Sequence, residues 1–363
     1  MHQIKRWVLI GLSFSLLIMA GCGGPKQQAT TQSKQTEATK TRIFKDSAGR
    51  KVKVPKKITR IAPSGPLAQM VLYSSVPNKL VGIASTFPDD AKNLIPKKYQ
   101  KLPQFGQFYG KSSTLNMEAL SAANPQVIID IGEPKDSVKT DMAKLQKQLD
   151  IPTVFIKADM NSMPQTYRKL AQLTGNRQHN QKLAAYCQQV LKQAKTAREK
   201  VKDQQISIYY ASGKSGLNTN AAGSFHAQIF VFFCVKNVVT GVTAASQGSG
   251  TTVSLEQLLK WQPDYILAEN KAVYQLIKSD SSWQQLTAVK ENRVYLVPST
   301  PYNFLGFPPS VNRILGIQWL GHLIYPDVYQ LNIKQTVQDF YQLFYHIHLD
   351  DQQTTEILQN AVR

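Results

Sequence analysis

Residues 114–129 read TLNMEALSAANPQVII, and residues 252–267 read TVSLEQLLKWQPDYIL. Both stretches have the pattern of a short helix, a turn that contains proline, and an apolar run that fits a strand of a parallel sheet. In each copy a glutamate, Glu118 or Glu256, stands seven residues before the proline. The same helix-turn-strand unit therefore occurs once in each half of the chain, which predicts two lobes of similar construction.

Further short apolar runs alternate with helical patterns around these two units, as is typical of α/β folds. Because 363 residues exceed what one hydrophobic core usually serves, two domains are expected. We predict two similar Rossmann-like α/β lobes, an N-terminal one over residues 42–176 and a C-terminal one over residues 203–345, followed by a C-terminal tail over residues 346–363. The apolar runs lie at residues 58–62, 153–156, 206–210 and 294–297.

One long amphipathic helix is predicted between the halves, over residues 177–202. Apolar side chains recur there at helical spacing, while Lys, Gln and Arg fill the remaining positions. At 1.5 Å per residue the helix would extend roughly 40 Å, enough to run along both lobes as a spine. The apolar positions are Leu183, Tyr186, Cys187, Val190, Leu191, Ala194 and Val201.

The N-terminus has the pattern of a signal peptide over residues 1–21, with basic Lys5 and Arg6 before an apolar stretch. The stretch is too short to cross a bilayer stably, which needs about 20 residues. Its end, Met-Ala-Gly before Cys22, resembles the lipobox of bacterial lipoproteins, in which the cysteine carries a lipid and becomes the mature N-terminus. An ordinary secretory signal is the alternative. Residues 22–41 have almost no apolar content and predict a flexible linker.

The formal net charge of +20 would favour anionic lipid headgroups or wall polymers and would steer anionic solutes toward the protein. Nucleic acid is a competing partner for such a charge, but the chain has no recognition motif, and export argues against it. Cys187 and Cys234 both lie in apolar surroundings and are interpreted as buried thiols. Sequence alone leaves a disulfide between them open.

Two α/β lobes joined by one long helix, behind a lipoprotein signal, resemble the substrate-binding proteins of bacterial ABC importers for iron chelates, haem and cobalamin. The resemblance covers about residues 42–345. Residues 301–313, followed by Trp319 and Leu320, resemble a branch of this family associated with iron compounds and, in some members, molybdate or tungstate. The other marks, in order, are residues 61–64, 116–129, 223–224 and 255–266.

One departure concerns residues 234–237, which read CVKN where family members often have Gly-Gly-Lys-Asn. A left-handed turn is harder to form without glycine. We therefore expect the pocket wall near Cys234 to differ from that of other members.

The resemblance implies a binding protein without catalytic residues and without a cofactor of its own. It would be an extracytoplasmic, lipid-anchored monomer that captures a siderophore- or haem-like iron complex and delivers it to a membrane permease and its ATPase. In the family a surface glutamate on each lobe engages permease arginines, and the matching positions are Glu118 and Glu256. A simpler interpretation is that each glutamate stabilises the first turn of its helix.

The ligand is expected between the lobes, on loops that follow the carboxyl ends of the strands. These loops are residues 63–66, 105–111, 132–134, 223–226 and 299–304. Ser64 and Gly65 precede a helix and could meet an anion, although Ser64 could equally be a helix N-cap. Arg313 could pair with an oxyanion or be an exposed first-turn residue. The aromatic candidates for ligand contact are Tyr109, His226, Tyr302 and Phe304.

Other functions are less consistent with the sequence. An oxyanion (molybdate or tungstate) or cobalamin could take the place of the iron complex. Direct metal ligation is not expected, since of the histidines after the signal only His226 falls on a predicted cleft loop. A lipid-anchored hydrolase would need a nucleophile elbow of the Gly-x-Ser-x-Gly type, which the chain lacks. The basic charge permits a purely adhesive surface lipoprotein, but the twin-lobe pattern does not require one.

Overall fold

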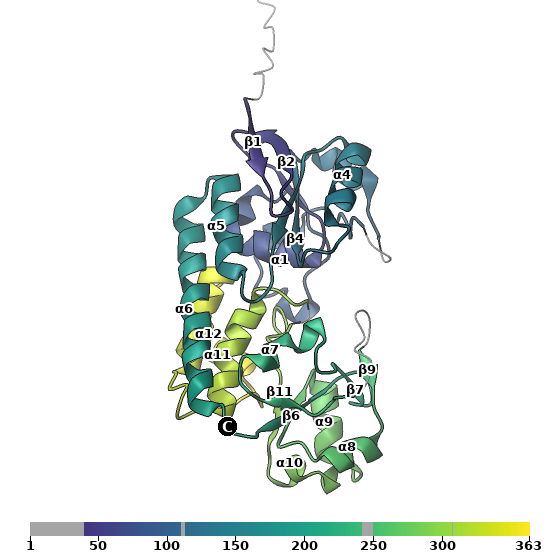
Figure 1. The fold of residues 1–363 in the computed structure, drawn as a ribbon, viewed down its shortest axis with the longest axis vertical. Coiled ribbons are helices and arrows are strands. Elements are labelled where there is room, and N and C mark those ends of the chain that lie inside the picture. Colours follow the sequence, from purple (N-terminus) through teal and green to yellow (C-terminus); the bar gives the residue numbers. More distant parts are fainter. Residues whose placement is uncertain (1–39, 110–112, 242–249, 307) are drawn as a thin grey trace, which may run out of the picture. The chain divides into compact units, whose positions relative to one another are not determined.

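The structure is a computed structural model that describes residues 40–109, 113–241, 250–306 and 308–363. Cys22, the signal and most of the linker lie outside these residues. Two α/β lobes are joined by the single helix α6 (Arg177–Val201), as Figure 1 shows. The predicted spine helix is therefore confirmed.

The N-terminal lobe is built on a parallel sheet in which β4 (Val127–Gly132) lies between β3 (Ile61–Pro63) and β5 (Thr153–Lys157). β4 is buried along five of its six residues, as its apolar sequence predicts. A hairpin of β1 (Thr41–Lys45) and β2 (Lys51–Pro55) precedes the sheet, and its first strand begins at the residue assigned to the end of the linker. The helices of this lobe are α1 (Pro66–Ser75), α2 (Lys97–Gln100), α3 (Met117–Ala123), α4 (Val138–Leu149) and α5 (Met163–Thr174).

The C-terminal lobe has a parallel sheet with the strand order β11-β10-β6-β8. Its strands are β6 (Ser207–Ala211), β8 (Lys236–Asn237), β10 (Tyr265–Ala268) and β11 (Val294–Leu296), and a small hairpin pairs β7 (Asn218–Thr219) with β9 (Thr251–Thr252). Its helices are α7 (Gln228–Val231), α8 (Leu255–Trp261), α9 (Lys271–Ser279) and α10 (Thr287–Lys290), and α11 (Asn312–Ile324) and α12 (Ile333–Phe340) follow.

The repeated unit has the same local structure in both lobes. The helix begins at an N-cap whose side chain accepts a backbone N–H, Asn116 in α3 and Ser254 in α8. It ends at a left-handed residue, Asn124 with φ 43° or Gln262 with φ 43°, before the central strand. The repeat seen in the sequence is therefore also a repeat of local structure.

Helix α6 buries its apolar face against both lobes. Tyr186 on α6 donates a 2.7 Å hydrogen bond to Gln318 of α11, and one cluster of buried side chains extends from β2 along α6 to Ala361. Because this core is continuous across the lobe boundary, α6 is a packed spine rather than a free hinge.

The prediction of a C-terminal tail over residues 346–363 was wrong. Helix α13 (Asp351–Ile357) begins with a capping box, and the residues after it complete the C-terminal lobe. The indole of Trp319 donates a 2.8 Å hydrogen bond to the Ala361 carbonyl, and the Leu296 N–H donates to the Asn360 carbonyl at 2.8 Å. The buried apolar side chains of this segment are spread along it without a strong period, so the sequence did not indicate a packed element: they are Ile347, Leu349, Leu358 and Ala361.

The predicted boundary at residue 345 also differs from the structure. The π-helical turn η5 (Tyr341–Tyr345) and His346 pack against the N-terminal lobe as well as against α12 of their own lobe. Phe344 stacks edge-on to Tyr167 of α5, and the His346 Nε2–H donates a 3.2 Å hydrogen bond to the Tyr73 carbonyl of α1. The chain thus crosses between the lobes a second time, beside α6.

Cys187 is fully buried and Cys234 is half-buried, and both are free thiols. Among the residues that the structure describes, no helix has the length and apolar character needed to cross a membrane.

Candidate functional site

Two hollows lie at the lobe boundary, where loops from the carboxyl ends of both sheets meet. The first has a volume of about 610 Å³ and lies between the loops that follow β4 and β5 and the helix α7. The second, of about 420 Å³, lies between residues 66–90 of one lobe and residues 269–308 of the other. Both volumes fall within the range of small-molecule sites, about 300–1,000 Å³.

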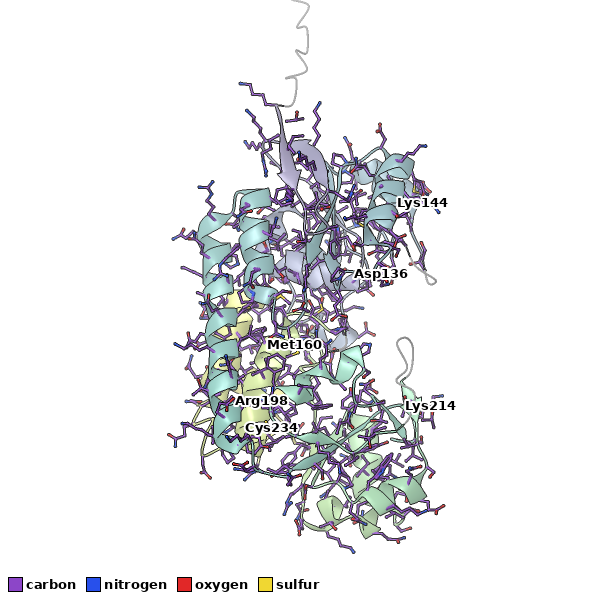
Figure 2. The ribbon with its side chains drawn as sticks, in the orientation of Figure 1. Asp136, Lys144, Met160, Arg198, Lys214 and Cys234 are labelled. Atoms are coloured by element: carbon purple, nitrogen blue, oxygen red, sulfur yellow. The ribbon has the colours of Figure 1, made fainter. Side chains whose placement is uncertain are left out.

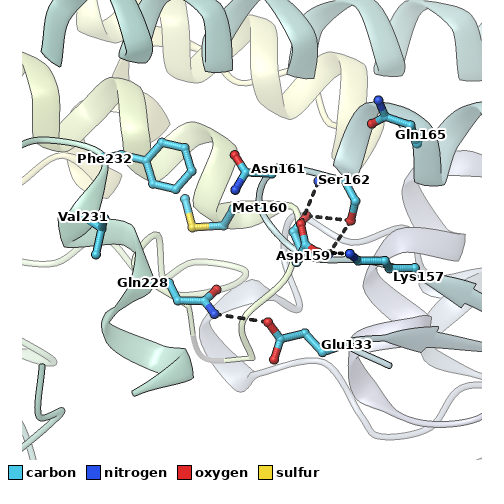
Figure 3. Close-up of a pocket in the computed structure, with 10 residues that line it drawn as sticks. All are labelled: Glu133, Lys157, Asp159, Met160, Asn161, Ser162, Gln165, Gln228, Val231 and Phe232. Atoms are coloured by element: carbon cyan, nitrogen blue, oxygen red, sulfur yellow. Dashed lines mark hydrogen bonds and ion pairs between the residues drawn. The ribbon is translucent and has the colours of Figure 1, made fainter. Parts of the chain in front are cut away.

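The first hollow is crossed by a contact between the lobes. The amide of Gln228 on α7 donates a 3.1 Å hydrogen bond to Glu133, which follows β4 (Figure 3). Asp159 lies nearby and pairs with Lys157 at 3.1 Å. Burial works to raise the pKa of Asp159, but hydrogen bonds from Ser162 and Lys157 outweigh it and lower the pKa below its ordinary value. Asp159 is therefore a carboxylate at neutral pH.

Arg313 lies in the first turn of α11 and is only 1% exposed. Burial lowers the pKa of its guanidinium to about 10, while the negative charges of Glu133 and Asp159 act against this shift. The residue keeps its positive charge at neutral pH, and that charge is coupled to the two carboxylates of the first hollow. The interpretation of Arg313 as an exposed helix residue was wrong.

His226 lies near Arg313, at the loop that precedes α7. Burial and the positive charge of Arg313 lower the pKa of its imidazole, against a hydrogen bond with the Gly306 backbone. Gly306 has a φ of 125°, and a Cβ there would lie 3.0 Å from Cδ of Arg313. Glycine therefore lets this loop approach the buried guanidinium closely.

Ser64 and Tyr109 meet at a buried carboxylate that the sequence analysis did not identify. Asp130 on β4 is 5% exposed and accepts hydrogen bonds from both hydroxyls, that from Tyr109 at 2.5 Å. Burial raises the pKa of Asp130 more than these two donors lower it. The cluster holds the loop after β3 and the loop that carries Tyr109 to the end of β4.

Ser64 is not a helix N-cap, which corrects the alternative interpretation. The N-cap of α1 is Gly65, in extended backbone with φ −177°, and no side chain caps it. The Ser64 carbonyl accepts the Phe108 N–H at 2.9 Å, so Ser64 positions the Tyr109 loop through both its backbone and its hydroxyl.

The second hollow contains Tyr302, as the sequence predicts for that loop. Burial raises the pKa of its phenol, while Gln69 nearby acts in the opposite direction. On the same loop Thr300 donates a 2.7 Å hydrogen bond to Asp90 of the other lobe. Phe304 differs from the prediction: its ring is fully buried edge-on to Trp319, so it supports the loop and presents no surface to a ligand.

Glu118 and Glu256 are both exposed in the first turn of their helices, α3 and α8. Their surroundings differ. Lys260 forms a 2.8 Å ion pair with Glu256, whereas alanine stands four residues after Glu118 and the neighbouring Met117 is 47% exposed. Neither glutamate caps its helix, because Asn116 and Ser254 do so.

Asp159, Gln228 and Asp130 were missed from sequence. A signal existed for Asp159, because the rule that selected the other loops applies equally to residues 158–162, which follow β5. No such signal existed for Asp130, because it lies inside an apolar strand.

The left-handed turn at Cys234, expected to be difficult, does form, with φ 54°. Its thiol accepts a 3.3 Å hydrogen bond from Nε of Arg198.

No group of three or more His, Cys, Asp or Glu side chains within the described ranges could hold a metal ion. The side chains that line the two hollows are mainly carboxylates, amides and hydroxyls, with the charge of buried Arg313 close to the first. They suit a ligand that brings its own acceptors or donors.

Known proteins share this architecture. A family model described as periplasmic binding protein matches residues 72–301. The molybdate-binding protein MolA of Haemophilus influenzae is 25% identical over 84% of this chain and 91% of its own length. The Fe(3+)-citrate-binding protein YfmC of Bacillus subtilis is 22% identical over 78% of this chain and 86% of its own.

The structure of an ABC transporter solute binding protein from Sulfurospirillum deleyianum has a TM-score of 0.79 to this chain, with 30% identity over 87% of this chain and 98% of the other. These relatives are binding proteins rather than enzymes, and the predicted two-lobed α/β fold is confirmed. The chain therefore belongs to the periplasmic binding protein family and is a substrate-binding protein of an ABC transporter.

Proposed function

We propose that the chain captures an anionic, oxygen-rich iron chelate at the lobe boundary and presents it to an ABC permease. The observation that carries the proposal is the buried guanidinium of Arg313, which lies beside His226 beneath that boundary. A buried arginine recognises carboxylate or other oxygen acceptors through paired N–H donors. Tyr302 lines the second hollow and adds aromatic surface from the C-terminal lobe.

The size of the hollows also favours a chelate. Volumes of about 610 and 420 Å³ are much larger than a bare tetrahedral oxyanion requires. A ferric complex of carboxylate or hydroxamate groups would bring both the bulk and the negative charge. The citrate complex named for YfmC belongs to this chemical class.

Molybdate is the second candidate, because Arg313 could serve a free oxyanion equally and the relative MolA is named for molybdate. Titration calorimetry with ferric citrate, a ferric hydroxamate, haem, cobalamin and molybdate separates the candidates. We expect the ferric complexes to bind more tightly. Tighter binding of molybdate than of any ferric complex would contradict the iron assignment, and no binding by any would contradict the proposal.

Replacement of Arg313 by lysine keeps the charge but removes the planar donor fork, so we expect affinity to fall about tenfold. Arg293, which pairs with Glu291 on the surface, provides the matched control. An Arg293→Lys variant should bind as the wild type does. Equal losses in both variants would show that Arg313 does not contact the ligand.

We further propose that residues 1–21 are removed and that a lipid on Cys22 tethers the monomer to the outer face of the membrane through the linker. A flexible linker of about 20 residues spans roughly 25 Å, which keeps the receptor within reach of a permease. A Cys22→Ser variant should bind ligand normally but should no longer be found in the membrane fraction. Retention of this variant on the membrane would contradict the anchor.

A further inference from the structure

A third hollow, of about 1050 Å³, lies between the spine helix, α5 and α7, and it shares Val231 and Phe232 with the first hollow. α5 lies alongside the N-terminal half of α6, where Arg168 donates a 2.5 Å hydrogen bond to Gln188 (Figure 1). α5 begins at Met163, so it does not cover the rest of α6. At the far end Arg198 reaches Cys234, just after α7, and the two residues lie together in Figure 2. Between these limits one face of α6 forms the floor of an open groove.

The groove is strongly basic. Four basic residues line it from α6 and the C-cap of that helix, namely Lys192, Lys195, Arg198 and Lys202, and Arg168 lines it from α5. Glu199 is the only acid among its lining residues. The four α6 residues recur every three or four positions, so their positive charges follow one face of the helix over roughly 15 Å.

The groove also has an apolar side. Leu191 and Phe232 are half-buried, and Val231 is 61% exposed, one of the few large apolar side chains with so much exposed surface. Basic residues along one side and an apolar strip along the other complement an amphipathic segment with acidic residues at helical spacing.

We propose that this groove docks an acidic amphipathic helix of a partner protein. Its concave form fits a helix better than a planar bilayer surface, and its apolar strip would gain nothing from a bare polyanion such as polyphosphate. The occupant would place acidic side chains at i, i+3 and i+7 against the α6 charges and apolar side chains against Leu191, Val231 and Phe232.

The test uses the full chain in detergent and two synthetic probes. One is an amphipathic peptide of roughly three turns with glutamates at the stated spacing, and the other is the same peptide with glutamine at those positions. Titration calorimetry should show the glutamate peptide binding at least about tenfold more tightly, with an affinity that falls as salt is raised.

The double variant Lys192→Glu/Lys195→Glu reverses two exposed charges in the groove, and peptide affinity should fall by about tenfold or more. Lys144→Glu/Lys147→Glu on α4 reverses two exposed lysines at the same spacing and should leave the affinity unchanged. Ferric citrate binding, measured in parallel, should survive in both.

Equal losses of peptide affinity in the two double variants would overturn the proposal, because the binding would then follow net charge alone. Equal affinity for the glutamate and glutamine peptides would also overturn it. A third contrary result would be groove-dependent binding to phosphatidylglycerol vesicles that the peptide does not displace, which would assign the groove to the membrane.

Discussion

Tyr109 donates a 2.5 Å hydrogen bond to Asp130, and that bond joins a loop of the lobe boundary to the buried central strand β4. Ser64 donates to the other oxygen of the same carboxylate. The carboxylate thereby holds two loops in place, but it does so at the cost of a charge removed from water.

Asp130 should make the unfolding free energy of the protein depend on pH. Burial raises its pKa above the ordinary value, so the folded state prefers the protonated carboxyl, and the stability that this provides is lost as the pH rises through the raised pKa. Asp130→Asn stays neutral, so its unfolding free energy should not fall in that window, which begins near pH 4. Urea unfolding across pH measures this, and parallel curves for the two proteins would contradict it.

His226 should make anion binding depend on pH. Its lowered pKa keeps the imidazole neutral at neutral pH, and protonation at lower pH would add a positive charge beside Arg313. If the ligand is anionic, as we propose, affinity should rise several-fold as the pH falls through the lowered pKa, and His226→Asn should remove the rise. Competition titrations over pH 5 to 7 provide the measurement, and an identical rise in the variant would exclude His226.

Glu118 and Glu256 should act in transport and not in binding. Replacing both with alanine should abolish uptake by the reconstituted transporter while ligand affinity stays near normal. Since Glu256 forms an ion pair with Lys260, Glu118→Ala alone should reduce uptake more than Glu256→Ala alone. A collapse of ligand affinity in the double variant would mean that the docking assignment is wrong.

Leu358, which follows α13, should contribute to global stability, because its side chain is 3% exposed within the main core. Leu358→Ala should lower the unfolding free energy by about 3 kcal/mol. The adjacent Gln359 is exposed, so Gln359→Ala should change it by less than about 0.5 kcal/mol. Similar small effects in both variants would show that the final residues are not part of the core.

The two free thiols should differ in reactivity. Cys187 is fully buried and burial raises its pKa, whereas Cys234 is half-buried. Under native conditions iodoacetamide should therefore modify Cys234 and spare Cys187, with modification of both after unfolding. Peptide mass spectrometry gives the sites, and early labelling of Cys187 would contradict its burial.

The elements that could be predicted from sequence were those with a strong local period or an internal repeat. The apolar face of α6 and the paired units around Glu118 and Glu256 belong to this group, since neighbouring residues determine each of them. The loops of the lobe boundary followed from strand order, because parallel strands bring their carboxyl ends to one edge.

What sequence did not reveal depends on contacts between distant segments. Phe304 and Tyr302 lie two residues apart on one loop, yet only Tyr302 reaches a hollow, because Phe304 packs on Trp319 and its carbonyl lies close to Gly316. In the sequence Asp130 is only a polar residue within a strand. Its role follows from the hydrogen bonds that Ser64 and Tyr109 donate to it in the folded protein. Tertiary packing, rather than local propensity, decides such positions.

Residues 360–363 also determine when the C-terminal lobe can finish folding. Ala361 and Asn360 accept hydrogen bonds from Trp319 and Leu296, and the Arg363 guanidinium donates to the Leu323 carbonyl and to the hydroxyl of Tyr265. The C-terminal lobe cannot complete its core before these residues leave the ribosome. For a chain that is exported as we propose, the lobe would stay incompletely folded until residues 360–363 are available, which would keep the preceding residues able to thread through a translocation channel.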